Sequence, residues 1–218
     1  MKIDEIFLSK NSIADSFIRN FTYPFEVLPN IKDYIIKLGT SLSDDYLKMA
    51  ENVWVHKNAS VNNTALIEGP CIIDADAEIR HNAYIRGSVI IGKNCVLGNS
   101  CEIKNSIMYD GVQVPHFNYV GDSILGYKSH LGAGSIISNL KADKKNIVIK
   151  NNDEIIDTNL RKIGAFLGDF VEVGCNCVLN PGTIIKSNTN IYPLTSVRGI
   201  IKENSIVKSM NNIVTKEG

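Results

Sequence analysis

The sequence predicts an all-β fold, a parallel β-helix built from hexapeptide repeats, and two observations carry this prediction. From Val55 onward every sixth residue is aliphatic over nine successive positions, and the residue four places after each is mostly small or β-branched. A period of six matches neither the 3.6-residue repeat of a helix nor the two-residue alternation of an ordinary strand. It matches short strands joined by tight corners, and hexapeptide repeats are typical of parallel β-helices.

The aliphatic positions form runs that differ in frame. The first run is Val55, Val61, Ile67, Ile73, Ile79, Ile85, Ile91, Leu97 and Ile103. The frame slips by one residue before each of the next two runs, which are Met108, Val114 and Val120, then Leu125, Leu131 and Ile137. The last run is Leu167, Val173, Leu179, Ile185, Ile191 and Val197. Three such positions close one coil, so these twenty-one predict seven coils with the aliphatic side chains inside a narrow prism.

Residues 1–52 lack the six-residue period and are predicted to form an N-terminal helical cap. Their composition favours short helices at Asp15–Phe21, Ile31–Leu38 and Ser43–Glu51, the last with Ser43 as its N-cap. Stacked architectures need terminal caps, because their end repeats would otherwise expose the core. We therefore expect these helices to cover the open amino-terminal end of the prism.

The β-helix domain is predicted to span residues 53–201, followed by a polar C-terminal tail at 202–218. A charged excursion at 140–162 interrupts the repeat. Within it, the segments NIVIK and EIID flank NND, a pattern that predicts a β-hairpin. Insertions on one face of a stacked fold often form its binding face.

Composition excludes several classes of protein. The chain has 23 Lys plus Arg and 23 Asp plus Glu, so no overall field attracts nucleic acid or an anionic membrane. It shows neither a signal peptide nor 18 consecutive apolar residues. Four of its five cysteines occupy small interior positions, where cysteine packs as a small hydrophobe; they are Cys71, Cys95, Cys101 and Cys177. We expect a reduced, cytoplasmic protein that acts on small molecules.

Two cations are predicted to stack on the outside of the prism. Residues 18 apart lie one above the other on adjacent coils, about 5 Å apart. Arg86 and Lys104 have this spacing, and each directly follows an inward aliphatic residue. Two stacked cations repel each other unless an anion lies beside them, and a phosphate suits both arginine and lysine. A solvated surface pair is the alternative from spacing alone.

A histidine lies on a neighbouring corner. His116 comes two residues after Val114 and is expected to face outward. After the frame slip, Ala133 in the glycine-rich segment HLGAGS holds the equivalent place one coil later, where a ligand can approach the backbone closely. Tyr119 follows three residues after the histidine. A histidine in this place suits general-base chemistry, although a lone outward histidine is also often inert.

Two runs of sequence point to a specific family. EIKNSIMYDGVQVPHFNYVGDSILGYKSHLGAGSIISNL resembles the acetyltransferase domain of the bifunctional N-acetylglucosamine-1-phosphate uridyltransferases/glucosamine-1-phosphate acetyltransferases. The continuation, IIDTNLRKIGAFLGDFVEVGCNCVLNPG, is similar to the archaeal-type sugar-1-phosphate nucleotidylyltransferase/acetyltransferases. The resemblance covers about residues 53–200 and implies that the β-helix is left-handed, against the usual right-handed crossover.

The resemblance also implies roles for individual residues. It puts the catalytic base on His116 and the residue that positions the amine on Asn139. The implied ligands of the sugar phosphate are Arg86, Lys104 and Tyr119, with His130 as a further substrate contact. Lys145, in the charged excursion, is expected either to contact the phosphate or to lie in a solvated turn. The implied contacts to acetyl-CoA are Ala133, Cys175 and Pro193. Backbone N–H groups around Gly132 and Ala133 are expected to stabilise the oxyanion of the tetrahedral intermediate.

Three positions depart from the bacterial pattern and leave the identity of the sugar open. His130 stands in place of an asparagine, Leu140 in place of a tyrosine, and Cys175 in place of a serine near the coenzyme. Residues 1–50 do not resemble the glycine-rich L-x-x-G-x-G-T-R opening of the nucleotidyltransferase half. We therefore expect no nucleotidyl transfer and no required metal.

The resemblance thus implies a homotrimeric, acetyl-CoA-dependent N-acetyltransferase. Its acceptor is expected to be a hexosamine 1-phosphate, glucosamine 1-phosphate first, in the formation of UDP-N-acetylglucosamine. One alternative is a non-catalytic module that binds a phosphosugar or sugar nucleotide. Another is a metalloenzyme like the γ-carbonic anhydrases, which share the scaffold but need three zinc-binding histidines; His81 and His116 are the plausibly spaced pair here.

Overall fold

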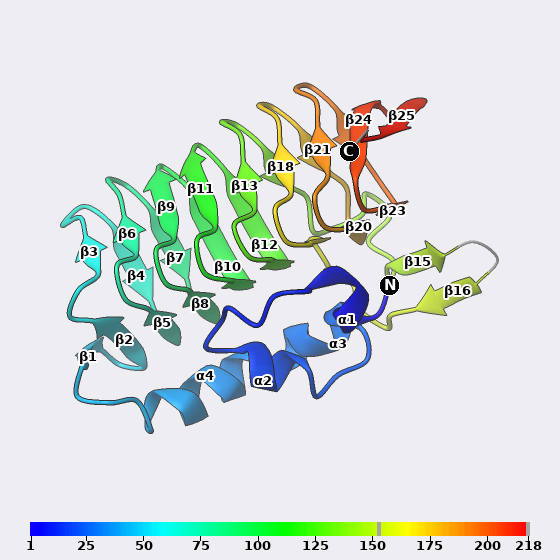
Figure 1. Ribbon diagram of the computed structural model, residues 1–218. Coiled ribbons are helices and arrows are strands. Elements are labelled where there is room, and N and C mark those ends of the chain that lie inside the picture. The colour runs from blue at the N-terminus through cyan, green and yellow to red at the C-terminus, as the bar shows by residue number, and fades with distance from the viewer. Residues whose placement is uncertain (152–153, 217–218) are drawn as a thin grey trace.

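The computed structural model describes residues 1–151 and 154–216 and has a left-handed parallel β-helix as its body (Figure 1). Short strands from successive coils pair in parallel and form three walls of a prism. In each coil the chain runs along the first, then the second, then the third wall. His116 lies at the corner where the third wall ends and the first wall begins.

The walls are built from the following strands. The first wall contains β4 (Leu66–Glu68), β7 (Tyr84–Arg86), the starts of β10 (Glu102–Met108) and β12 (Tyr119–Leu125), β14 (Ile136–Ile137), β19 (Val178–Leu179) and β22 (Ser196–Val197). The second contains β2 (Val53–His56), β5 (Cys71–Ile73), β8 (Val89–Ile91), the ends of β10 and β12, β17 (Ala165–Leu167), β20 (Thr183–Ile185) and β23 (Ile200–Ile201). The third contains β3 (Ser60–Val61), β6 (Glu78–Ile79), β9 (Val96–Asn99), β11 (Gln113–His116), β13 (His130–Leu131), β18 (Glu172–Val173), β21 (Asn190–Ile191) and β24 (Ser205–Ser209).

The predicted interior is confirmed. Every aliphatic position of the repeat is buried except Val61, which is 38% exposed, and Ile67, which is half-buried; both belong to the first coil. The four cysteines assigned to small interior positions are buried, whereas Cys175 is exposed. Corners are made by residues with positive φ, such as Asn94 and Asn176 at +55°. Asparagine enters this left-handed backbone region more readily than other side chains do.

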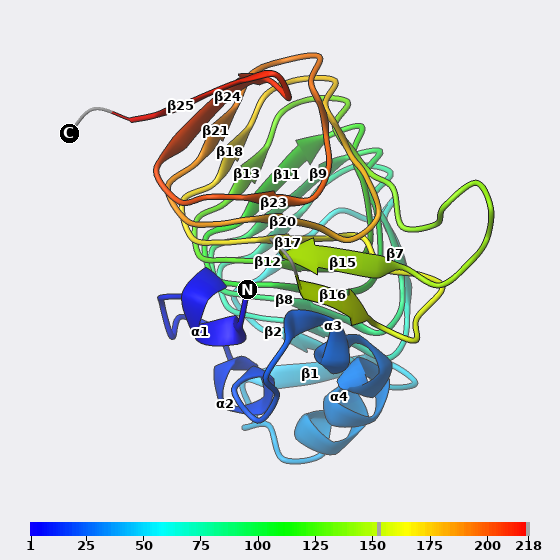
Figure 2. The same ribbon diagram turned by 90° about the vertical axis from the view of Figure 1, so that its right-hand side faces the viewer.

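The N-terminal helices lie along the second wall and do not cover the end of the prism (Figures 1 and 2). They are α1 (Ile3–Ile6), α2 (Asp15–Ile18), α3 (Pro24–Val27), the 3-10 helix η1 (Leu28–Asn30) and α4 (Ile31–Gly39). The Phe7 ring packs edge-on against Tyr109, with centroids 5.4 Å apart, and α4 contacts β5, β8 and β10. The prediction that this segment caps the amino-terminal end was therefore wrong.

An apolar outer face explains where the helices lie. On the second wall most residues that point out of the prism are also aliphatic or aromatic and are fully buried beneath neighbouring segments; these are Ile72, Ile90, Ile107, Ile124, Phe166 and Ile184. Burial of such side chains stabilises the fold, whereas the end of the prism offers only one coil to cover. The predicted helix at Ser43–Glu51 was also wrong, because Tyr46–Ala50 forms strand β1, antiparallel to β2.

Two features depart from the regular coils. Strands β15 (Val148–Asn151) and β16 (Glu154–Asp157) pair antiparallel, as the predicted hairpin requires; residues 152–153 of its NND segment lie outside the described residues. The predicted polar tail was wrong, because β24 adds an eighth parallel strand to the third wall, and β25 (Asn212–Thr215) pairs antiparallel with it. The β-helix is thus longer than the seven predicted coils.

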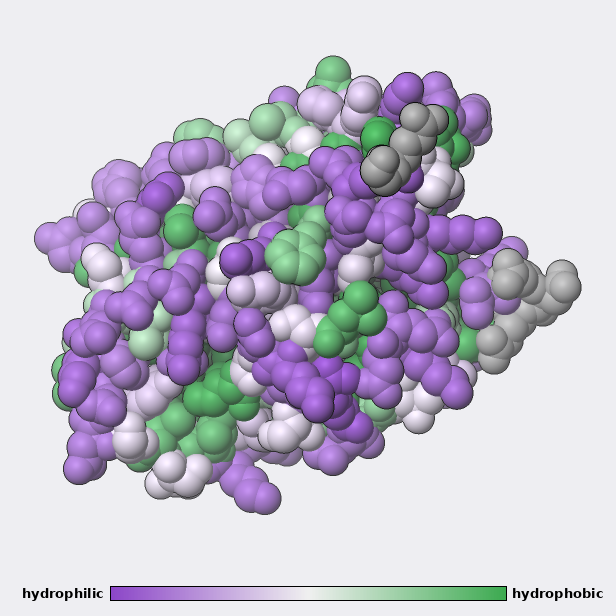
Figure 3. All heavy atoms as spheres, in the orientation of Figure 1, coloured by the Kyte–Doolittle hydropathy of each residue, from purple (hydrophilic) through white to green (hydrophobic). Residues whose placement is uncertain are grey.

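The outer surface is mostly polar. In the view of Figure 3 hydrophilic residues predominate, with small apolar patches between them. Across residues 1–151 and 154–216, no helix combines the length and the hydropathy needed to cross a membrane.

Candidate acyl-transfer site

The corner between the first and second walls carries the two stacked cations. Strand β7 pairs with β10 so that Ile85 lies beside Ile103, which places Arg86 and Lys104 on adjacent coils as the 18-residue spacing predicted. Each cation has a carboxylate partner: Arg86 Nη1 lies 2.7 Å from Glu102 Oε1, and Lys104 Nζ lies 3.1 Å from Asp122 Oδ2. These pairs hold both cations in place.

Tyr119 and Asn139 join the same cluster. Asn139 Nδ2 lies 3.3 Å from Tyr119 Oη and also donates a hydrogen bond to Asp122 Oδ2. Burial, and then the nearby carboxylates of Asp122 and Glu102, raise the pKa of Tyr119, so its phenol keeps its proton at neutral pH. The structure therefore brings together the four residues Arg86, Lys104, Tyr119 and Asn139, which we call the phosphate cluster.

Sequence reasoning missed Asp122. The residue is 4% exposed, and its carboxylate touches three side chains of this corner: Lys104, Asn105 and Asn139. A sequence signal was present, because Asp122 lies in the long run that resembles the acetyltransferase domain, in its segment PHFNYVGD, and occupies the corner place that Asn105 holds one coil earlier. Its role could be seen only once its partners were known.

His116 ends β11 at the corner between the third and first walls, with its side chain exposed. Its carbonyl oxygen accepts a hydrogen bond of 3.0 Å from the N–H of Gly134, so the segment HLGAGS stacks on it, as predicted. Buried Asn118 fixes the two corners together: its Oδ1 accepts the His116 N–H at 3.0 Å and its Nδ2 donates to Gly132 O at 2.8 Å.

The residues assigned to acetyl-CoA lie at the same corner on the following coils. The Asn176 N–H donates to Ala133 O, and the Leu194 N–H donates to Cys175 O, each at 2.9 Å. Ala133, Cys175 and Pro193 therefore lie on three consecutive coils above His116, in what we call the corner column. The column is a continuous strip of backbone and small side chains along which an extended ligand can lie.

Two apolar residues flank the corner column and were not foreseen. Phe117 is 60% exposed and Leu194 is 79% exposed. Both have positive φ, +52° and +62°, a conformation that is an outlier for bulky side chains. Strain of this kind often accompanies functional sites. The available signal was a bulky apolar residue at corners where asparagine or glycine is usual.

Two predicted substrate contacts lie apart from the phosphate cluster. His130 belongs to β13 of the third wall, where its Nδ1 lies 2.9 Å from Glu172 Oε2. Lys145 lies on the exposed excursion, and its backbone N–H donates to Asp143 Oδ1 at 3.0 Å. In the described part of the chain, neither side chain forms a hydrogen bond or ion pair with the cluster.

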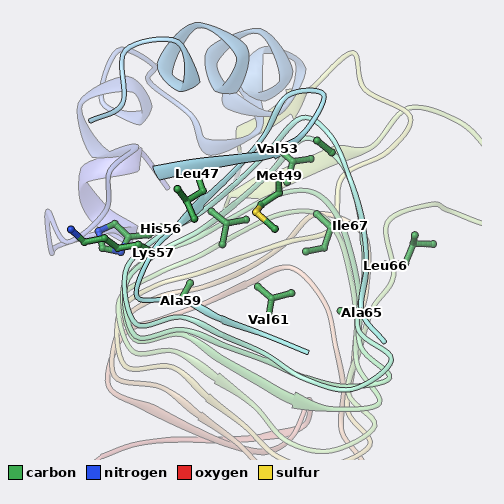
Figure 4. A pocket seen from close by; sticks show the side chains of 12 residues that line it. Leu47, Met49, Val53, His56, Lys57, Ala59, Val61, Ala65, Leu66 and Ile67 are labelled. Atoms are coloured by element: carbon green, nitrogen blue, oxygen red, sulfur yellow. The ribbon is translucent and has the colours of Figure 1, made fainter. Parts of the chain in front are cut away.

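The site is polar and open, unlike the apolar hollow in Figure 4. That hollow has a volume of about 510 Å³ and is lined by β1 and the first coil, including Met49, Val61 and Leu66. It is the uncapped end of the prism core. Among the described residues, no group of three or more His, Cys, Asp or Glu side chains is arranged to hold a metal ion.

The three-walled coil defines a left-handed parallel β-helix of hexapeptide repeats. Residues 67–191 match the family of the GMPPB C-terminal domain, and the chain belongs to this family. The resemblance to archaeal-type bifunctional enzymes is confirmed by curated relatives.

A bifunctional sugar-1-phosphate nucleotidylyltransferase/acetyltransferase of Sulfurisphaera tokodaii is 38% identical over 88 residues, which is 40% of this chain and 22% of that protein. The bifunctional protein GlmU of Methanococcus maripaludis is 33% identical over 113 residues, which is 51% of this chain and 27% of that protein. The aligned region thus covers about a quarter of the length of these relatives.

Solved structures with similar coils include two acetyltransferases. The acetyltransferase domain of PglB from Neisseria gonorrhoeae, in complex with acetyl coenzyme A, aligns with a TM-score of 0.32 and 11% identity, covering 76% of this chain and 58% of that one. GDP-perosamine N-acetyl transferase from Caulobacter crescentus aligns with a TM-score of 0.31 and 15% identity, covering 88% and 75%. At these TM-scores the alignments carry no weight for function.

Proposed function

We propose that the chain is an acetyl-CoA-dependent N-acetyltransferase whose acceptor is a hexosamine 1-phosphate, glucosamine 1-phosphate first. One observation carries the proposal: the phosphate cluster and the corner column border the same first wall. The cluster offers a guanidinium, an ammonium, a phenol and an amide, which suit a phosphorylated sugar. The column begins at a histidine. The names of the curated relatives, which include sugar-1-phosphate and acetyltransferase, support the same reading.

In the proposed reaction His116 is the general base. The free amine of the sugar attacks the thioester carbonyl, forming the N–C bond, while the imidazole takes a proton from the amine. When the C–S bond breaks, the imidazolium returns that proton to the leaving thiolate. No covalent acyl-enzyme is needed, because both substrates are held along one wall.

Of the three backbone N–H groups of Gly132, Ala133 and Gly134, one is free to act as the oxyanion donor among the described residues. The N–H of Gly132 is already engaged, at 2.6 Å from Val173 O, and that of Gly134 bonds to His116 O. Among the described residues, no backbone acceptor is paired with the N–H of Ala133. We propose that this N–H receives the thioester oxygen, since preorganised donors of this kind stabilise a tetrahedral intermediate.

Thiol release from acetyl-CoA, measured across a panel of amino-sugar phosphates, tests the proposal. His116→Ala should lower kcat roughly 10²- to 10⁴-fold with the KM for acetyl-CoA nearly unchanged. His81→Ala is a matched control, because His81 lies on the same corner two coils earlier and its Nδ1 contacts Thr64 Oγ1, at 2.8 Å. Normal turnover by the His116 variant would remove this residue from the mechanism. Sugar-phosphate binding without thiol release would favour the non-catalytic binding module.

We further propose that the chain forms a homotrimer. His130 lies on the third wall, so it can meet a substrate on the first wall only if a second copy supplies it. The first wall carries partly exposed apolar residues at Ile136 (37%) and Val178 (39%), which a neighbouring copy would cover. Light scattering that gives the mass of a single chain would contradict this assembly.

A further inference from the structure

The buried carboxylate of Asp122 lies behind the candidate acceptor site and contacts it only through other side chains. We propose that Asp122 is a positioning residue that fixes the amide of Asn139 with its oxygen toward the substrate, and thereby selects a primary amine over a hydroxyl as acceptor. This inference rests on the proposed acetyl transfer and adds how the site recognises the nucleophile.

The hydrogen bonds around Asp122 leave Asn139 one orientation. Asp122 Oδ1 accepts from Asn105 Nδ2 at 2.9 Å, and its Oδ2 accepts from Lys104 Nζ at 3.1 Å and from Asn139 Nδ2. An ionised carboxylate can only accept hydrogen bonds, so the NH₂ of Asn139 must face it. A flipped amide would bring two acceptor oxygens together, which is costly at a residue only 4% exposed.

The free group of Asn139 is therefore its oxygen. The second N–H of its amide points to Tyr119 Oη at 3.3 Å. Within residues 1–151 and 154–216, no protein donor is bonded to Asn139 Oδ1, and the side chain is half-buried. The site thus offers an acceptor, and no donor, from Asn139 to whatever occupies the first wall.

An acceptor at this place matches an amine. A primary amine has two N–H bonds, so it can give one proton to His116 and still donate the other to Asn139 Oδ1. A hydroxyl has a single O–H, and once that proton goes to His116 the oxygen of Asn139 is left without a partner. An unpaired polar group of this kind disfavours the wrong ligand by about 10- to 100-fold.

Asp122 can be replaced without straining the backbone. It has φ of +51° and occupies the same corner place as Asn105 (+43°) and Gly87 (+80°) on the preceding coils. Asparagine and glycine are therefore both compatible with this corner. Asp122→Asn offers one acceptor oxygen where the carboxylate has two, and Asp122→Gly offers none. Asp122→Gly therefore removes the restraint that holds Asn139, and Asp122→Asn weakens it because one of the two acceptor oxygens becomes an NH₂ group.

The experiment compares two probes that differ only at the acceptor, glucosamine 1-phosphate and glucose 1-phosphate. Their binding is measured by calorimetry with CoA present, alongside thiol release from acetyl-CoA. In the Asp122 variants we expect the ratio of the two affinities to fall about 10- to 100-fold, together with kcat for the amine. Any change in the phosphate contacts of Lys104 affects both probes alike and cancels in the ratio.

Asp169→Asn is the matched control. Asp169 is 2% exposed and accepts the N–H groups of Ser9 (2.6 Å) and Tyr127 (3.0 Å) at a different corner. Its variant should keep the wild-type ratio even if it unfolds at a lower temperature. Equal weakening of both probes in the Asp122 variants, or an unchanged ratio, overturns the inference. Absence of thiol release by the wild type would instead refute the proposed function, and the affinity ratio would still test Asp122.

Discussion

Replacing Arg86 by alanine tests phosphate binding by the cluster with little effect on the stability of the fold. The Arg86 side chain is 43% exposed and its partner Glu102 is 35% exposed. Exposed pairs contribute only about 0–1 kcal/mol, so the free energy of unfolding should change by no more than that. A hydrogen bond to a charged group contributes about 1.5–3 kcal/mol. Arg86→Ala should therefore raise the KM for glucosamine 1-phosphate by roughly 10- to 150-fold.

The assay is thiol release from acetyl-CoA at varied concentrations of sugar phosphate. Because Arg86 lies on the opposite corner of the first wall from His116, kcat should change little. Arg80→Ala is the control: Arg80 pairs with Glu78 at 2.9 Å, with side chains 38% and 47% exposed, outside the cluster. If both variants keep the wild-type KM, the phosphate cluster does not bind phosphate and the reasoning fails.

Three further predictions concern the scaffold. Ile107→Ala, in the covered outer face of the second wall, should lower the free energy of unfolding by about 2–5 kcal/mol, whereas Ile136→Ala, 37% exposed, should cost under ~1 kcal/mol; denaturant titrations giving equal losses would contradict the assigned cover. Gly98→Ala should abolish the folded state by circular dichroism, because its Cβ would lie 1.6 Å from Pro115 O; a native-like spectrum would refute the close approach. Burial raises the pKa of Asp110, so the contribution of Asp110 to stability is full below the pKa of the unfolded state and is lost as pH rises through the pKa of the folded state. Asp110→Asn should remove this contribution from the pH dependence of the melting temperature. An unchanged dependence would contradict the prediction.

The coil and its core could be predicted from sequence because each hexapeptide specifies its own strand and corner. An aliphatic residue such as Ile85 and a small residue such as Ala83 point inward whatever the rest of the chain does. Stacking then places Arg86 over Lys104 by counting alone. The same arithmetic put Ala133 above His116, and the structure agrees.

The six-residue repeat could not predict contacts between segments that lie far apart in the chain. Phe7 meets Tyr109, and the N–H of Ser9 bonds to Asp169, 160 residues away, and no local period encodes either contact. The outward aliphatics of the second wall, such as Ile107, did signal a cover, but they could not say which segment supplies it. For that reason the N-terminal helices were expected at the wrong place.

The same distinction between local pattern and long-range contact applies to the candidate site. The residue types of the proposed phosphate cluster and the proposed base His116 follow from motif and spacing, since each occupies a fixed place in a coil. The orientation of Asn139 and the presence of Asp122 behind it follow only from the tertiary structure. A side-chain amide has two ends of nearly equal shape, and only the groups packed around it in space decide which end faces the substrate.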